Sequence, residues 1–178
     1  TKAFFEDMIA SGILPEGSLQ LVNGSGVGII DHVTHQDVVT FTGSAHTGRK
    51  LKNHPVILNE SVLFNMEADS LNAAVLGPDA VPGTAEFNLF VKEVHREMTV
   101  KTGQKCTAIR RILVPENLVE EVQKALGARL DKTTIGDPTA EGVRMGTLAS
   151  MLQVDRCREQ IAKLAQDNEV IYAKDNFD

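Results

Sequence analysis

Hydrophobic and polar positions along the chain follow two different periods, and each period predicts one kind of element. In several segments apolar residues recur three and four positions apart, as on one face of a helix; Phe87, Val91 and Val94 are an example. The predicted helices cover residues 3–11, 29–33, 45–53, 84–99, 116–130 and 150–166. Short runs of β-branched and other apolar residues predict strands. The predicted strands cover residues 19–22, 38–41, 61–66, 71–76, 109–114 and 170–173.

The order of these elements indicates the fold class. Strands and helices alternate through much of the chain, which favours an α/β fold with a parallel sheet. We place a domain boundary near residue 100, between the alternating part, residues 1–99, and residues 100–178, which begin at a loop that carries a cysteine. No complete doubly wound unit with its first glycine-rich turn is visible, and the chain begins with Thr1. We therefore expect an incomplete fold whose sheet needs strands from outside this sequence.

The composition excludes several classes of partner. The chain has 178 residues and a formal net charge of −6, and its charges are scattered, so no basic patch for nucleic acid or an anionic membrane is visible. No apolar stretch reaches the roughly 20 residues that span a bilayer, and no signal-peptide pattern is found. Two cysteines are too few for a disulfide framework and suit a reducing compartment. We expect a cytoplasmic protein with free thiols.

Cys106 is a candidate nucleophile. It follows the turn Gly103-Gln104-Lys105 between a predicted helix and a predicted strand, so its side chain can project toward a site, and Lys105 would favour its thiolate. A buried cysteine that acts as a small hydrophobic residue is the alternative that the local sequence leaves open. Cys157 lies inside a predicted helix without a glycine turn, which indicates packing or a surface position.

Two further positions suggest chemistry at strand ends. Glu67 follows the predicted strand 61–66, where catalytic groups gather in parallel sheets, although on local sequence alone a solvated turn carboxylate is the better interpretation. Thr42-Gly43-Ser44, with Gly48 after it, places N–H groups and a hydroxyl at a predicted helix start, which suits a phosphate or ribose group. A plain helix N-cap by Ser44 explains the same pattern. His32 and His35 share a spacing of three, but no nearby residues complete a metal-ligand set, so we expect no metal site.

Several short motifs, taken together and in order, carry a resemblance. They are Leu14-Pro15-Glu16-Gly17, Asn23-Gly24-Ser25-Gly26, Phe41-Thr42-Gly43-Ser44, Gly48-Arg49, Glu67, Gly103-Gln104-Lys105-Cys106-Thr107-Ala108 and Gly136-Asp137-Pro138. In this order they resemble the aldehyde dehydrogenase superfamily over essentially the whole chain. Glu67-Ala68-Asp69-Ser70-Leu71-Asn72 and the segment from Gln104 to Arg111 look most like the dehydrogenase part of the bifunctional ring-opening enzyme of bacterial phenylacetate degradation. The resemblance implies that residues 1–99 are the C-terminal part of an NAD(P)-binding domain and residues 100–178 the N-terminal part of a catalytic domain.

The resemblance also implies a mechanism and its residues. Cys106 would attack the aldehyde carbon to give a thiohemiacetal, and hydride transfer to NADP or NAD would leave a thioester on Cys106. Glu67 would take a proton from the water that hydrolyses this thioester. The backbone N–H of Cys106 would donate half of an oxyanion hole, with an asparagine upstream of Thr1 as the other donor. The cofactor would lie against Gly26, Thr42, Gly43, Ser44 and Ala68.

Departures from the family pattern leave alternatives open. Most members carry Glu-Leu-Gly-Gly where this chain has Glu67-Ala68-Asp69-Ser70, so the mobility of Glu67 is in question. The expected reaction is hydrolytic oxidation of an aldehyde, which would be a ring-opened, CoA-linked semialdehyde. The alternatives are an acylating dehydrogenase that releases the thioester to coenzyme A, and a non-catalytic scaffold. The resemblance further implies a homo-oligomer in the complete enzyme, with a hydratase domain fused to it in the nearest relatives.

Overall fold

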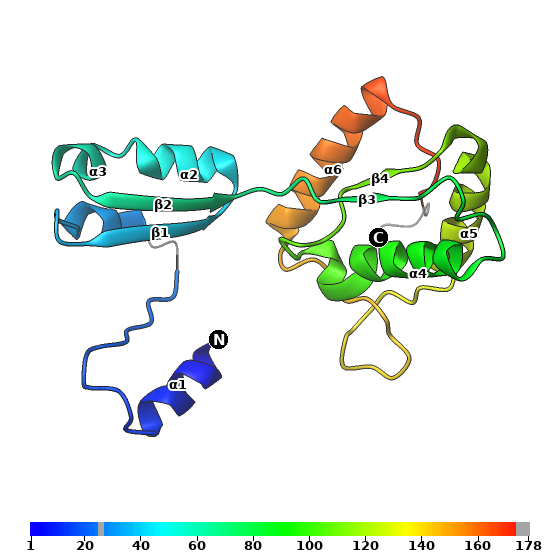
Figure 1. Ribbon diagram of the computed structural model, residues 1–178. Coiled ribbons are helices and arrows are strands. Elements are labelled where there is room, and N and C mark those ends of the chain that lie inside the picture. The colour runs from blue at the N-terminus through cyan, green and yellow to red at the C-terminus, as the bar shows by residue number, and fades with distance from the viewer. Residues whose placement is uncertain (25–26, 174–178) are drawn as a thin grey trace. The chain divides into compact units, whose positions relative to one another are not determined.

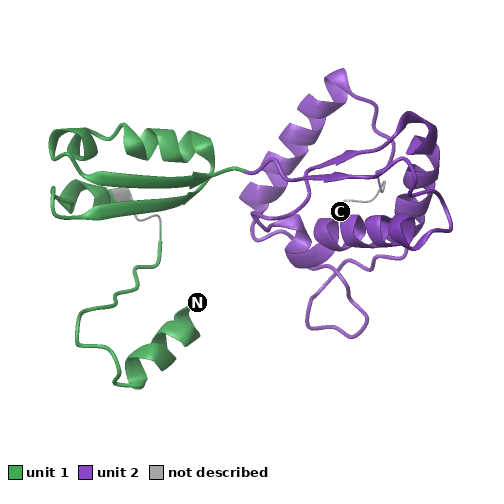
Figure 2. Cartoon of the chain, in the orientation of Figure 1, with its two compact units in different colours: residues 1–69 green, residues 70–178 purple. Residues whose placement is uncertain are grey.

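The chain forms two compact units, and the computed structural model describes residues 1–24 and 27–173. The first unit is Thr1–Asp69 and the second is Ser70–Asp178 (Figure 2). This division falls earlier than the boundary we predicted near residue 100, because helix α4 (Ala85–Thr99) packs into the core of the second unit. The assignment of residues 1–99 and 100–178 to two domains of a complete enzyme stays a prediction.

The first unit holds a parallel pair of strands. Strand β1 (Val38–Gly43) pairs with β2 (Leu63–Ala68) in a register that runs from Val38 opposite Leu63 to Gly43 opposite Ala68 (Figure 1). The other elements of this unit are α1 (Lys2–Ala10), the 3₁₀-helix η1 (Val27–His32), α2 (Ala45–Lys52) and α3 (Pro55–Asn59). The buried side chains of Ile30, Ile57 and Val62 form the apolar core beside this sheet.

The second unit holds the other parallel pair. Strand β3 (Ala73–Val75) pairs with β4 (Arg111–Leu113), and Ala73 lies opposite Arg111. The remaining elements are α4, η2 (Val100–Gly103), η3 (Glu116–Leu118), α5 (Val119–Asp131) and α6 (Met151–Asp167). The core gathers apolar side chains of α4 and α5 and of the segments beside the strands. Its buried members are Leu76, Ala80, Phe87, Val91, Leu118 and Val122.

Most predicted elements are confirmed, and so is the parallel α/β class. Helical periodicity placed α4 correctly because its apolar face, with Phe87, Val91 and Val94, is the buried one. The same pattern also located α1 and α6, which have no buried residues in this chain. The predicted strands at 19–22 and 170–173 are wrong, since neither segment is paired with another strand among the described residues. A strand needs a hydrogen-bonding neighbour, and local composition cannot supply one.

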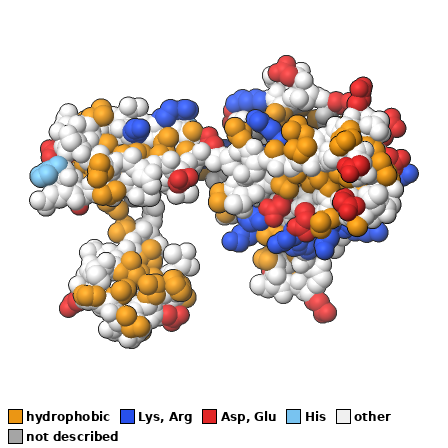
Figure 3. All heavy atoms as spheres, in the orientation of Figure 1, with side chains coloured by type: hydrophobic (Ala, Val, Ile, Leu, Met, Phe, Trp, Pro, Cys, Tyr) orange, Lys and Arg blue, Asp and Glu red, His pale blue; other side chains and the backbone are white. Residues whose placement is uncertain are grey.

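Each small sheet is covered on one face. In β1 and β2, Phe41 and Met66 face α2, and the glycine at position 48 allows that close approach: a Cβ there would collide with the Met66 sulfur. On alternate positions Leu63 and Val75 are exposed, and hydrophobic side chains (orange) are visible on the surface of both units (Figure 3). Parallel sheets are normally covered on both faces.

Within the described ranges, none of the helices is long and apolar enough to cross a membrane.

Candidate active site

Cys106 lies on a tight loop between α4 and β4. The chain turns sharply after α4 because Lys101, Thr102 and Gly103 all adopt left-handed backbone conformations, with φ of 51°, 57° and 68°. Glycine is the residue that takes this conformation at least cost. The thiol of Cys106 is exposed, as is that of Cys157 on α6. The loop therefore presents Cys106 to solvent and does not bury it as a packing residue.

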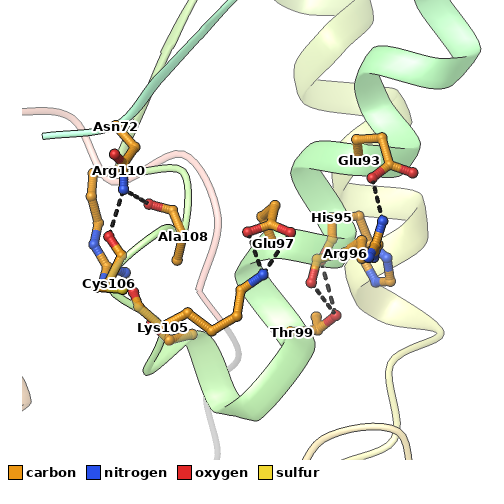
Figure 4. Close-up of polar contacts among 11 residues, drawn as sticks. Asn72, Glu93, His95, Arg96, Glu97, Thr99, Lys105, Cys106, Ala108 and Arg110 are labelled. Atoms are coloured by element: carbon orange, nitrogen blue, oxygen red, sulfur yellow. Dashed lines mark hydrogen bonds and ion pairs between the residues drawn. The ribbon is translucent and has the colours of Figure 1, made fainter. Parts of the chain in front are cut away.

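The side chains of Asn72, before β3, and Arg110, at the end of the loop, bind its backbone carbonyls (Figure 4). Asn72 Nδ2 donates to the carbonyl oxygens of Cys106 and Ala108, at 2.6 and 3.1 Å. The guanidinium of Arg110 donates to the carbonyl oxygens of Gly103 and Lys105, at 3.0 and 2.9 Å. These contacts give the exposed Cys106 a backbone that is held by defined hydrogen bonds.

Lys105, the residue before Cys106, is half-buried and ion-paired. Its Nζ lies 2.8 and 2.7 Å from the two carboxylate oxygens of Glu97 on α4, and the two side chains retain 21% and 16% of their exposure. Figure 4 shows the lysine side chain reaching from the loop to the helix. The ammonium thus has a partner other than the Cys106 thiolate that we predicted for it.

The first unit brings together the other predicted site residues. The register of β1 and β2 places Thr42 opposite Glu67 and Gly43 opposite Ala68, at the carboxyl ends of both strands. Glu67 is exposed and lies within β2, not in a turn after it. Ligands of α/β proteins bind beyond the carboxyl ends of parallel strands. Gly26, the remaining predicted cofactor residue, lies outside the described residues.

Ser44 caps helix α2, as one of its two interpretations predicted. Its hydroxyl oxygen accepts a hydrogen bond from Thr47 N–H at 3.2 Å. The Asp69 carboxylate accepts a second bond from Ala45 N–H, at 3.1 Å. The exposed residues Thr42 and Gly43 lie beside this capped helix start, at a strand end of the kind where α/β proteins bind ligands.

Sequence reasoning missed four residues that shape these two sites. Asn72, Glu97 and Arg110 support the Cys106 loop, and Asp69 binds the start of α2. A signal was available for Asp69, because it stands where most aldehyde dehydrogenases have glycine and its φ of 57° is left-handed. Asn72 and Cys106 are 34 positions apart, so the local sequence around either residue could not predict their contact.

Comparison with known proteins gives the family. A model described as the aldehyde dehydrogenase family matches residues 1–175. The chain belongs to the aldehyde dehydrogenase family.

Curated relatives include semialdehyde dehydrogenases. The 3,4-dehydroadipyl-CoA semialdehyde dehydrogenase of Aromatoleum evansii is 50% identical over 169 residues, which are 95% of this aldehyde dehydrogenase chain and 33% of that protein. The alpha-ketoglutaric semialdehyde dehydrogenase of Bacillus subtilis is 31% identical over 157 residues, which are 86% of this chain and 31% of that protein. The chain spans about a third of the length of these relatives.

Solved structures show the same fold. Betaine aldehyde dehydrogenase of Staphylococcus aureus, crystallised with NAD+, superposes with a TM-score of 0.80 at 22% identity, and the match covers 94% of this chain and 32% of that one. Aldehyde dehydrogenase of Bartonella henselae gives a TM-score of 0.81 at 20% identity, over 98% of this chain and 36% of that one. Both units therefore have the aldehyde dehydrogenase fold over about a third of its length.

Proposed function

We propose that this chain supplies the nucleophile and the general base of an NAD- or NADP-dependent aldehyde dehydrogenase. The observation that carries the proposal is the exposed thiol of Cys106 on a loop whose carbonyls are bound by Asn72 and Arg110. An exposed thiol can reach an aldehyde carbon, and a fixed backbone keeps it in one place. Family membership supports the same assignment.

The reaction would proceed in two stages on Cys106. The thiolate adds to the aldehyde carbon, the carbonyl oxygen becomes an oxyanion, and the backbone N–H of Cys106 donates a hydrogen bond to it. The nicotinamide cofactor, when bound, accepts the hydride of that carbon. Glu67 then takes a proton from water, whose oxygen attacks the thioester; the carboxylic acid leaves and the thiol of Cys106 is restored.

The residues at the carboxyl ends of β1 and β2 would hold the cofactor. Thr42, Gly43 and Ser44 are exposed beside the start of α2, and Ala68 is the register partner of Gly43. The Ala45 and Thr47 N–H groups at this helix start are bound by Asp69 and Ser44 within the chain, so the exposed hydroxyl of Thr42 and the backbone of Gly43 are the groups that would meet ribose or phosphate oxygens.

The proposed substrate is a ring-opened semialdehyde linked to coenzyme A, of the kind formed in phenylacetate degradation. The 50% identity to a protein named 3,4-dehydroadipyl-CoA semialdehyde dehydrogenase supports this class. The presence of Glu67 favours hydrolysis over transfer to coenzyme A. We further propose that the protein acts in the cytoplasm as a homo-oligomer and that a hydratase domain is fused to it.

The assignment of Cys106 is tested in the full-length protein with NAD(P) and a semialdehyde substrate. Cys106→Ala should lower kcat by about 10⁴-fold or more, as removal of a covalent nucleophile does. Cys157→Ala is the matched control, because that thiol is also exposed and should leave kcat unchanged. Mass spectrometry should detect an acyl group on Cys106 of the wild type. Activity that survives Cys106→Ala would contradict the proposal.

A further inference from the structure

The two peptide groups that flank Cys106 are both held through their carbonyl oxygens by side chains. The Lys105 carbonyl, which belongs to the peptide before Cys106, accepts from Arg110 Nη2 at 2.9 Å. The Cys106 carbonyl, which belongs to the peptide after it, accepts from Asn72 Nδ2 at 2.6 Å. Each side chain also binds a second carbonyl of the loop, so neither can rotate without losing two hydrogen bonds.

Holding a carbonyl also fixes the N–H on the other side of the same peptide bond. A peptide bond is planar, and in the trans form its C=O and N–H point in opposite directions. Both peptide bonds here are trans. The Lys105 carbonyl accepts from Arg110 Nη2 and, at 3.2 Å, from Ala108 N–H, and these two bonds together set the direction of the Cys106 N–H. Asn72 fixes the plane of the peptide group that joins Cys106 to Thr107.

Asn72 and Arg110 are themselves joined to each other. Arg110 N–H donates to the Asn72 carbonyl at 2.8 Å, directly before the point where β3 and β4 pair. The two side chains thus start from adjacent backbone at the ends of two hydrogen-bonded strands. A site supported by paired strands holds its geometry better than one supported by a free loop.

We propose that Asn72 and Arg110 are positioning residues that aim the backbone N–H of Cys106 at the oxyanion formed from the aldehyde. This inference rests on the proposed function, because it assigns a role in the attack by Cys106. The N–H must point at the oxyanion before the reaction begins, since a donor that has to turn during the reaction stabilises the transition state less. Neither residue touches the substrate in this role.

The test compares the rates of two reactions of the Cys106 thiol in the full-length protein. Acyl-enzyme formation needs the oxyanion donor and is followed as the burst of NAD(P)H. Alkylation of Cys106 by iodoacetamide attacks a saturated carbon, forms no oxyanion and needs only the thiolate. A residue that aims the N–H should therefore affect the first rate and leave the second unchanged.

Asn72→Leu and Arg110→Lys are the test variants. Leucine keeps the approximate size of asparagine but has no hydrogen-bond donor. Lysine keeps the positive charge of arginine but cannot donate to two carbonyls with the planar geometry of a guanidinium. Asn88→Leu and Arg96→Lys are the controls. Asn88 Nδ2 donates to the carbonyl of Thr84, the N-cap of α4, and Arg96 forms an ion pair with Glu93, so neither side chain binds a carbonyl of the Cys106 loop in these contacts. Each test variant should lower the burst rate by about 10- to 100-fold, less than the roughly 10²- to 10³-fold loss of a whole oxyanion donor. KM for NAD(P) should stay within about twofold, since the proposed role gives these two residues no part in holding the cofactor.

The outcomes separate this inference from the proposed function. A burst rate equal to that of the controls would overturn the positioning role. A parallel fall in burst and alkylation rates would also overturn it, because the variants would then act on the thiol. If the wild type shows no burst and no acyl group on Cys106, the proposed function itself fails. If Asn72→Leu does not fold, Arg110→Lys carries the same comparison.

Discussion

The Asp69 carboxylate accepts a hydrogen bond from the backbone N–H of Ala45 at 3.1 Å. This contact ties the residue directly after β2 to the start of helix α2, and Asp69 N–H also donates to the Gly43 carbonyl at 3.1 Å. Glu67, the proposed base, lies two residues earlier on the same strand. The chain thus fixes the backbone after the base at a position where most aldehyde dehydrogenases have a flexible glycine.

Asp69 combines a favourable contact with an unfavourable backbone angle. Its φ of 57° lies in the left-handed region. Asp69→Ala should lower the free energy of unfolding by about 1–2 kcal/mol, because it removes the bond to the helix start and keeps the left-handed angle. Asp69→Gly should cost less, since glycine adopts this angle freely. Chemical denaturation measures the free energy of unfolding of both variants. If Asp69→Gly loses more of it than Asp69→Ala, the explanation is contradicted.

Glu67→Gln should stop the reaction after the first stage. The amide cannot accept a proton from water, so the burst of NAD(P)H should remain while steady-state turnover falls by about 10²- to 10⁴-fold, the usual contribution of a general base. Glu60→Gln, at the end of α3, is the matched control and should turn over normally. Undiminished turnover of Glu67→Gln would reject hydrolysis by Glu67. Formation of a CoA thioester from added coenzyme A would favour the acylating alternative.

Gly48→Ala tests the packing of helix α2 on the first sheet. The new methyl group would collide with the Met66 side chain and crowd the Phe41 ring. Overpacking of this kind should lower the free energy of unfolding by about 1–3 kcal/mol. Gly28→Ala is the control, because a Cβ there meets no atom within 4 Å. Equal stabilities of the two variants, measured by chemical denaturation, would show that α2 shifts to accept the methyl group.

His95 should make stability depend on pH. Burial, and then the positive charges of Arg129 and Arg144, lower the pKa of His95 below its ordinary value of 6.5. Below that value the unfolded chain binds more protons than the folded one, so the free energy of unfolding should fall as the pH drops below about 6.5 and level off above it. The fall should be smaller in His95→Gln when both proteins are denatured chemically over this range. Parallel profiles of wild type and variant would contradict the assignment.

The sequence by itself determined the elements whose signal is local. The apolar face of residues 84–99 predicted α4, since the period of the pattern and the burial of Phe87 and Val91 have the same cause. The motifs around Ser44, Glu67 and Cys106 indicated the family that the comparison confirmed. The glycine turn before Cys106 was visible as well, because a left-handed backbone selects glycine at Gly103.

Only the tertiary structure decided which distant residues meet. The register that puts Thr42 opposite Glu67 and the bonds from Asn72 to the Cys106 loop join residues far apart in sequence. Pairing partners also decided the strands: residues 19–22 have strand-like composition but no paired neighbour in the described structure. Hydrogen bonds between strands and from side chains to distant carbonyls depend on positions in space, and local periodicity carries no information about them.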